Sequence, residues 1–210
     1  MDLSVIIPCH NLEKFIEPLL SSLSEQEFQP YTIEVVFVLD SCTDNTEQVV
    51  FEWSQKNEHL NPILINTKVN SPGLARNIGI EHSQGKYIWF VDGDDWILET
   101  DACRQIIEYL ELTDAPFIRF DYKFDPKFQY YHHPSMVWQY GFSREAIGTQ
   151  RFSNIIPHED GEFMKIFFRR YNPPPFMAKF LYYYNFGREG STMQRFITCQ
   201  QERSECHESH

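Results

Sequence analysis

Apolar residues in the first 110 positions alternate between runs typical of buried strands and spacings typical of helices. Short β-branched and aromatic runs predict strands over 3–8, 33–39, 62–65 and 87–91. Apolar residues three and four positions apart predict intervening helices over 12–23, after the N-cap residues 41–45, over 72–81 and over 101–112. Strands that alternate with helices predict an α/β fold, built on a mostly parallel sheet flanked by helices.

The second half of the chain loses this alternation. It contains aromatic clusters, a Pro173-Pro174-Pro175 break and one predicted helix over 159–170. No Gly/Ser-rich linker separates the two halves. We therefore expect residues 1–112 and 113–210 to form two functionally different halves of one compact unit.

The net charge and its distribution along the chain limit the kinds of molecule that the protein could bind. The chain has 210 residues, 42% of them hydrophobic, and a formal net charge of −12. Residues 1–110 contain 18 Asp and Glu but 6 Lys and Arg, whereas the remainder has 12 of each. So acidic a protein is a poor candidate for following a nucleic-acid backbone. An acidic half suits a site for a divalent cation.

The remaining composition predicts a protein of the cytoplasm. Five cysteines are widely scattered with no CxxC pair, which argues against a disulfide framework or a zinc site. We find no signal-peptide pattern at the N-terminus, and the longest apolar runs are strand-sized. We expect a soluble, cytoplasmic protein, with contact at the inner face of a membrane left open.

Acidic residues follow the predicted strands where a parallel sheet binds its ligands, beyond the carboxyl ends. Asp40 follows the second strand, and Asp92-Gly93-Asp94-Asp95 follows the fourth. Clustered carboxylates repel one another unless a cation neutralises them, and oxygen ligands suit Mg²⁺ or Mn²⁺. Gly93 would allow a ligand to approach the backbone. We expect Asp94 and Asp95 to lie exposed at the strand end. An acidic turn elsewhere, such as at Asp44, is more simply a solvated helix cap.

Three separated blocks of sequence stand out together: SVIIPCHN, VVFVLDSCTDNT and SPGLARNIGIEHSQGKYIWFVDGDDW. In order and spacing they resemble the nucleotide-sugar half of the family 2 (GT-A fold) glycosyltransferases of the bacterial polysaccharide type. Further on, PHEDGEF resembles the family's ED block, and 182–192 resembles its late tyrosine and Gly-Ser-Thr segment. Agreement of separated blocks is more specific than a lone DxD motif. The resemblance implies a GT-A fold, Rossmann-like, with an acceptor-side C-terminal extension.

The resemblance also implies residue roles. It places Pro8 and His10 along the base and ribose, Asp40 on the nucleobase as in uridine-nucleotide users, and Arg76 beside the nucleotide. Asp92 and Asp94 form the DxD, around Gly93, with Asp94 or Asp95 ligating the metal that bridges the diphosphate. Asp160 is implied as the general base with Glu159 beside it; the alternative for both is a helix cap, and His158 is a minor candidate for the base.

Two departures from the family pattern affect these roles. Leu39-Asp40-Ser41-Cys42 stands where the family has Asp-Asp-Gly-Ser, so one aspartate is lost and the base preference is less certain. The chain then ends after a polar tail at 200–210, shorter than many relatives. We therefore expect a small acceptor side.

The function predicted from the sequence is that of an inverting, metal-dependent glycosyltransferase. Mn²⁺ or Mg²⁺ would stabilise charge on the leaving nucleoside diphosphate, and a carboxylate would deprotonate the attacking hydroxyl. The expected partners are a nucleotide-sugar, preferably a UDP-sugar, and a saccharide or lipid-linked acceptor. Residues 163–188, with five basic, no acidic and ten aromatic residues, predict either an aromatic acceptor groove or a membrane-facing surface. The alternative function is a non-catalytic nucleotide-sugar-binding protein.

Overall fold

The computed structural model describes residues 1–125, 135–155 and 158–186. The strands are β1 (Leu3–Cys9), β2 (Ile33–Asp40), β3 (Pro62–Thr67), β4 (Tyr87–Phe90), β5 (Trp96–Ile97), β6 (Phe117–Phe124), β7 (Tyr140–Ser143) and β8 (Phe176–Tyr184). The α-helices are α1 (Glu17–Ser24), α2 (Thr46–Lys56), α3 (Pro72–His82), α4 (Ala102–Thr113), α5 (Arg144–Ile147) and α6 (Glu159–Arg170). Two short 3-10 helices are η1 (Glu58–Leu60) and η2 (Val137–Gln139).

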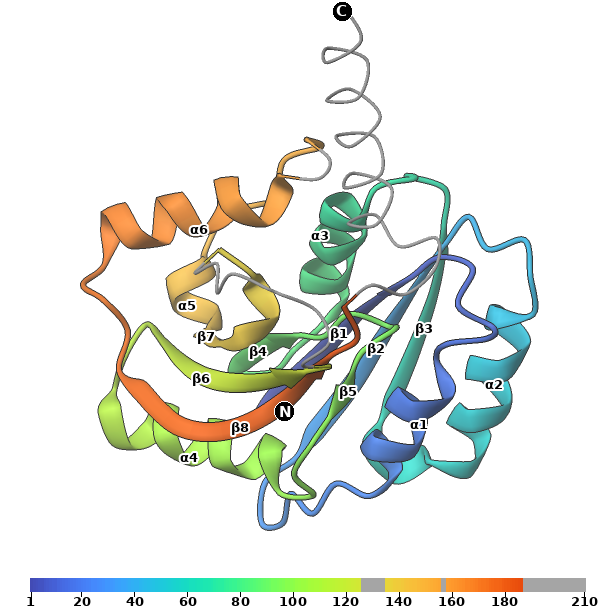
Figure 1. Cartoon of the computed structure of the whole chain (residues 1–210), viewed down its shortest axis with the longest axis horizontal. Helices are drawn as coiled ribbons and strands as arrows, with labels where there is room; N and C mark the ends of the chain where they lie inside the picture. Colours follow the sequence, from blue (N-terminus) through green and yellow to red (C-terminus); the bar gives the residue numbers. More distant parts are fainter. Residues whose placement is uncertain (126–134, 156–157, 187–210) are drawn as a thin grey trace, which may run out of the picture.

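One curled, mostly parallel sheet organises the described chain, in the strand order β3-β2-β1-β4-β7-β6-β8-β5 (Figure 1). β1 is central to the first half, pairing in parallel with β2 and β4, while β3 lies in parallel beside β2. The predicted α/β fold is confirmed. The predicted helices over 72–81, 101–112 and 159–170 are confirmed within one residue at each end.

The second half of the chain forms β-strands that its sequence pattern does not predict. β7 pairs antiparallel with β4 and β6, and β8 lies parallel to β6 and antiparallel to β5. These strands were missed because β7 has four residues, and because β6 and β8 are interrupted by register shifts that break the alternation of apolar positions. Both halves therefore build one sheet, and position 112 falls inside α4.

Helices cover both faces of this sheet (Figure 1). On one face, α1, α2 and α4 bury leucine, isoleucine and tryptophan side chains against β1, β2 and β4. On the other face, α3, α5 and α6 pack against the alternate residues of the same strands, including Val36, Ile88 and Phe90. Burial on both faces explains why these strands read as continuous apolar runs. The arrangement leaves the carboxyl ends of β1, β2 and β4 at one edge.

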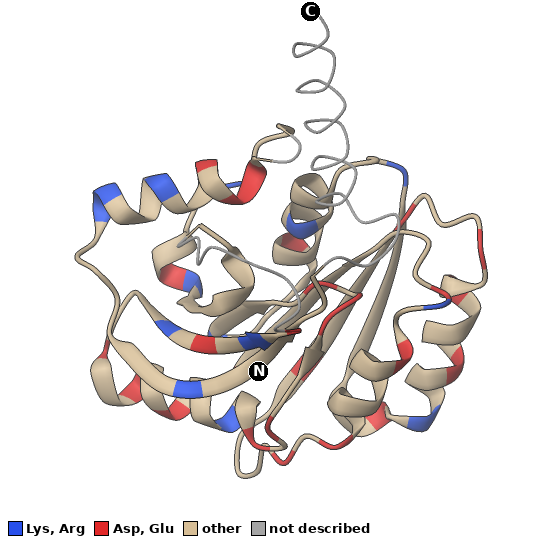
Figure 2. Cartoon of the chain, viewed as in Figure 1, with Lys and Arg blue, Asp and Glu red and all other residues tan. Residues whose placement is uncertain are grey.

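Charge is distributed unevenly over the fold. Acidic residues are frequent on α1, α2 and the loops of the first half, whereas Lys and Arg mark β6, β8 and the last turns of α6 (Figure 2). None of the helices in the described ranges has both the length and the apolar character required to cross a bilayer. The tail at 200–210, and the Gly-Ser-Thr segment that resembles the family, lie outside the described residues.

Candidate functional site

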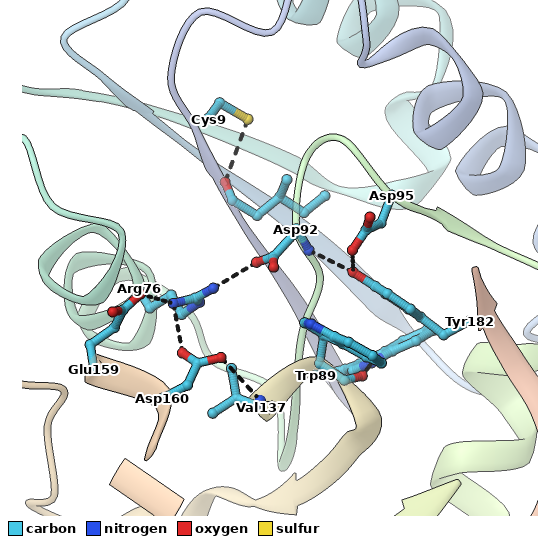
Figure 3. A network of polar contacts seen from close by, with 11 residues as sticks. Cys9, Arg76, Trp89, Asp92, Asp95, Val137, Glu159, Asp160 and Tyr182 are labelled. Carbon is cyan, nitrogen blue, oxygen red and sulfur yellow. Dashed lines mark hydrogen bonds and ion pairs between the residues drawn. The ribbon is translucent and has the colours of Figure 1, made fainter. Parts of the chain in front are cut away.

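A single buried arginine joins the two halves of the predicted site. Arg76, on α3, is 3% exposed and donates to Asp92 at 2.6 Å and to Asp160 at 3.0 Å (Figure 3). Its Nη1 also lies 3.4 Å from a carboxylate oxygen of Glu159. Burial lowers the pKa of Arg76, but the three carboxylates outweigh this and hold that pKa above its ordinary value. Arg76 is therefore a permanent cation shared by the strand-end carboxylate and the start of α6.

The position and the raised pKa of Asp160 both suit a side chain that accepts a proton. Its second oxygen accepts a hydrogen bond from the Val137 N–H at 3.2 Å, so the side chain faces Arg76 and η2 rather than capping its own helix. Burial raises the pKa of Asp160 to about 7, and the charges of Asp92 and Glu159 act in the same direction against Arg76. A carboxylate with a pKa near neutrality suits general-base work.

Glu159 lies deeper than Asp160 and is 7% exposed. One oxygen faces Arg76, and the other has no hydrogen-bond partner among the described atoms. Its side chain also packs 3.1 Å from where a Cβ on Gly73 would stand, so a glycine at the start of α3 gives it room. Glu159 thus contributes charge next to Arg76, while Asp160 has the more accessible carboxylate.

The loop after β4 is held by a tyrosine from β8. The Tyr182 hydroxyl donates to the carboxylate of Asp95 and accepts from the backbone N–H of Asp92 at 3.1 Å. The Asn185 N–H donates to the other oxygen of Asp95 at 2.8 Å. Trp138 stacks on the Tyr182 ring with centroids 4.6 Å apart. The far end of the sheet therefore fixes the DxD loop.

The expectation that Asp95 is exposed is wrong. The side chain is buried at 1% exposure, and burial together with the charges of Asp94 and Asp92 raises its pKa well above the ordinary value. Both oxygens already accept hydrogen bonds within the protein. The reason is the unpredicted strand β8, which covers this carboxylate. Asp94, by contrast, is partly exposed.

Gly93 lies close to protein rather than beside an open space. A Cβ at this position would collide with the Leu12 side chain and approach the Pro8 carbonyl oxygen to 3.3 Å. Pro8 is half-buried at the end of β1, and the exposed His10 places its ring nitrogen Nδ1 2.7 Å from the Asp40 carbonyl oxygen. These contacts bring Pro8, His10 and Gly93 to one sheet edge, and their predicted roles toward a nucleotide stay predictions.

Asp40 has a clear contact set of its own. One carboxylate oxygen accepts the N–H groups of Val69 and Asn70, and the other accepts the Ser71 N–H at 2.9 Å. Ser71 in turn caps α3, the helix that carries Arg76. The side chain is 4% exposed. Asp40 therefore fixes the start of α3, and its predicted reading of a nucleobase stays a prediction.

The carboxylates at the strand ends have the oxygen ligands that a divalent cation prefers. Within residues 1–125, 135–155 and 158–186, no three His, Cys, Asp or Glu side chains are arranged to bind a metal by themselves. Asp92 uses one oxygen for Arg76 and keeps its side chain 26% exposed, and Asp94 follows two residues later. Mg²⁺ is commonly bound by one or two carboxylates together with substrate phosphates. The carboxylates of Asp92 and Asp94 fit such a site, whereas both oxygens of Asp95 already accept hydrogen bonds; the predicted metal roles of Asp92 and Asp94 stay predictions.

Residues 4–172 match the family model described as Glycosyl transferase family 2. The chain belongs to this family. Poly(ribitol-phosphate) beta-N-acetylglucosaminyltransferase TarS of Staphylococcus aureus is 40% identical over 97 residues, which are 46% of this chain and 17% of TarS. The family 2 chain thus spans less than a fifth of that relative.

Solved structures share the fold of this family 2 chain. A crystal structure of S. aureus TarS 1–349 in complex with UDP-GlcNAc matches with a TM-score of 0.80 and 24% identity, covering 92% of this chain and 61% of that one. A mannosyltransferase from Pyrobaculum calidifontis, in complex with GDP-Man and Mn²⁺, has a TM-score of 0.73 and 18% identity, covering 90% and 58% of the two chains. These likenesses establish the predicted GT-A fold.

Sequence reasoning missed the residues that hold the site together. Tyr182 was noted only as part of a tyrosine block, and neither Asn185 nor Val137 was singled out. Tyr182 bridges two acidic positions 87 and 90 residues away, so only the unpredicted pairing of β8 reveals it. The sequence carries no signal for this contact, because the strand that brings Tyr182 to the acidic loop is not predicted.

Proposed function

We propose that this chain transfers a sugar from a UDP-sugar to a hydroxyl group of a saccharide or polyol-phosphate acceptor, with inversion at the sugar carbon. The observation that supports it is the shared guanidinium of Arg76, which lies between Asp92 at the donor end of the sheet and Asp160 at the start of α6. A donor bound along β4 and an acceptor over α6 would then meet at this arginine. Membership of a glycosyltransferase family supports the reaction class.

Asp160 is proposed as the base that takes the proton of the acceptor hydroxyl. Its pKa of about 7 keeps it basic enough to accept a proton near neutrality. Arg76 holds this carboxylate in place and stabilises its ionised form, and Glu159 balances the arginine. Attack by the deprotonating hydroxyl on the face opposite the leaving group inverts the sugar carbon.

Asp92 and Asp94 would hold a Mn²⁺ or Mg²⁺ ion that neutralises charge on the diphosphate of the donor. The role of Tyr182 is to fix the loop on which both aspartates stand, through Asp95 and the Asp92 N–H. The relative in complex with GDP-Man and Mn²⁺ supports a metal-dependent donor site in this fold.

Donor and acceptor classes follow from the named relatives. TarS crystallises with UDP-GlcNAc, which supports a UDP-sugar as donor, and its name describes a poly(ribitol-phosphate) acceptor. We extend both to this chain as proposals. The predicted cytoplasmic location and membrane contact stay predictions.

Turnover separates this proposal from the non-catalytic alternative. We would incubate the purified chain with UDP-GlcNAc, UDP-glucose or GDP-mannose and Mn²⁺, with and without poly(ribitol phosphate), and measure nucleotide release and sugar incorporation. The proposal expects polymer-dependent release from a UDP-sugar, and a proton NMR coupling constant that reports an inverted linkage. Binding of UDP by calorimetry without any nucleotide release would favour a binding protein. Transfer with retained configuration would contradict the proposed role of Asp160.

A further inference from the structure

Two cation–aromatic pairs stand on one face of β6 and β8. The guanidinium carbon of Arg119 lies 4.7 Å from the ring centre of Phe176, and the ammonium of Lys123 lies 5.4 Å from that of Phe180. The rings are unusually open for phenylalanine, at 43% and 47% exposure. With Asp121 between the two cations, these residues are called the cation–aromatic face.

The strand register puts these side chains together on the side away from the α4 core. Arg119 pairs with Phe176 and Asp121 with Phe180 across the two parallel strands. The intervening β6 residues, Phe120 and Tyr122, are buried in the core on the opposite face. Strand alternation therefore directs Arg119, Asp121 and Lys123 to one surface, and Figure 2 shows the charged positions along β6 beside β8.

The two cations are positioned without being neutralised. Within the part of the chain that the structure describes, no hydrogen bond or ion pair is formed by the side chain of Arg119 or Lys123. A cation over a ring gives up conformational freedom but keeps its N–H donors directed outward. Fixed, unneutralised donors are suited to an anionic group such as a phosphate.

The cation–aromatic face leads to the proposed reaction site. On the same face of β6, Phe117 packs against Phe167 in the later turns of α6, seven residues after Asp160. Along β8, Tyr182 comes two residues after Phe180, but its side chain is buried in the opposite core and contacts the DxD loop from there. Lys123 pairs with Tyr183, which pairs with Trp96 just after the DxD loop, so a ligand lying from Arg119 to Lys123 would run towards that loop.

We propose that the cation–aromatic face binds an acceptor chain with repeating phosphodiester groups. This inference rests on the proposed transferase function and names the class of its acceptor. Residues two apart in a strand are roughly 6.6 Å apart, so Arg119 and Lys123 are about 13 Å apart with a carboxylate midway. Cations suit the phosphates, and the Asp121 carboxylate suits hydroxyl groups of the sugar or polyol between them.

A lipid surface fits this face less well than a soluble polyanion. Both rings already have a cation over one side, so their insertion into a bilayer would carry charge with them. Asp121 would also approach an anionic headgroup layer, which repels it. The membrane is therefore the rival occupant that the experiment has to exclude.

The test measures polymer binding and donor chemistry separately. Binding of poly(ribitol phosphate), of neutral dextran and of phosphatidylglycerol-containing vesicles is measured for the wild type and for the double variant Arg119→Gln/Lys123→Gln. Lys86→Gln is the matched control, because Lys86 also lies over a ring, that of Tyr87 at 4.8 Å, but at the opposite end of β4 from Asp92. Hydrolysis of UDP-GlcNAc without acceptor reports the donor site.

We expect salt-sensitive binding of poly(ribitol phosphate) that weakens roughly 3- to 30-fold in the double variant, as two exposed charge contacts allow. In the double variant, dextran binding and donor hydrolysis should stay at wild-type values. In Lys86→Gln, polymer binding should also equal that of the wild type. Equal polymer binding by the double variant overturns the inference, as does loss of vesicle binding with polymer binding unchanged. If the wild type shows neither donor hydrolysis nor transfer, the proposed function fails. The polymer-binding measurement still tests the cation–aromatic face in that case.

Discussion

The guanidinium of Arg76 lies 3.0 Å from the carboxylate of Asp160, 84 positions further along the chain. The same guanidinium lies 2.6 Å from Asp92, so the carboxylate at the end of β4 and the proposed base share one buried charge. A change at either carboxylate alters the electrostatic environment of the other. The shared contact therefore joins site residues from both halves of the chain.

Replacing Arg76 should destabilise the protein strongly. Arg76→Met leaves Asp92, Glu159 and Asp160 without their common cation, and removal of one partner from a buried ion pair typically costs about 3–5 kcal/mol. Urea denaturation followed by circular dichroism measures the change. Arg104→Gln removes a more exposed arginine paired with Asp101 and should change the free energy of unfolding by less than about 1 kcal/mol. Equal losses of unfolding free energy in the two variants would show that the buried network around Arg76 stabilises the fold no more than a surface ion pair.

The hydroxyl of Tyr182 should matter more than that of its neighbour. Tyr182→Phe leaves the buried carboxylate of Asp95 and the Asp92 N–H without this partner, at a cost of about 1–3 kcal/mol in unfolding free energy. Metal-dependent UDP binding should weaken as well, because the DxD loop is less fixed. Tyr183→Phe is the control, since the Tyr183 ring stacks on Trp96 with centroids 4.0 Å apart and would keep that contact. Thermal denaturation and calorimetry with UDP and Mn²⁺ report both effects.

Substitutions at Asp94 and Asp95 should have different effects, one on metal-dependent UDP binding and the other on protein stability. Asp94→Ala is expected to abolish the Mn²⁺-dependent part of UDP binding with little change in stability, because Asp94 is partly exposed. Asp95→Ala removes the acceptor of Tyr182 and Asn185, and each buried donor left unpaired costs about 1–3 kcal/mol. Calorimetry and denaturation of both variants provide the comparison. A destabilised Asp94→Ala with normal metal-dependent binding would reverse these assignments.

The reaction should require a deprotonated Asp160, and its pKa is about 7. We expect kcat/KM for transfer to rise with pH through about 7 and then level off. A kcat/KM that stays constant down to pH 5 would contradict the assignment, because it would indicate an ordinary, unburied carboxylate. The profile is measured between pH 5 and 9, with Glu162→Gln as a variant whose midpoint should not move.

The same pKa gives a stability prediction of defined sign. The pKa of Asp160 is higher in the folded protein than its ordinary value of 3.8, so its contribution to stability is complete below pH 3.8 and is lost as pH rises through about 7. The stability difference between wild type and Asp160→Asn should therefore fall with rising pH, by at most about 1.4 kcal/mol per unit. Denaturation at pH 5 and pH 8 gives this difference. A constant difference would mean that the carboxyl group has the same pKa folded and unfolded.

The sequence predicted what depends on local pattern. The continuous apolar runs of β1, β2 and β4, and the helical spacing of Ile106 and Leu110, are strong local patterns that the structure confirms. It did not predict β8, since aromatic residues there follow neither period cleanly and the register shifts against β6. The burial of Asp95 and the Tyr182 contact depend on that strand. β8 pairs with β5, more than 80 residues earlier in the chain. Such pairing is determined by tertiary packing, which the strand propensity of a short segment does not reveal.

The most direct test of the central claim is the rate of sugar transfer by Asp160→Asn under single-turnover conditions. The variant keeps the size of the side chain but cannot accept the proton, so we expect a rate about 10²- to 10⁴-fold lower. UDP-sugar affinity should change less than about threefold, and Glu162→Gln, at a partly exposed position on α6 paired with Lys165, should react at the wild-type rate. A normal rate in Asp160→Asn, with loss instead in Glu159→Gln or His158→Ala, would contradict the assignment of the base.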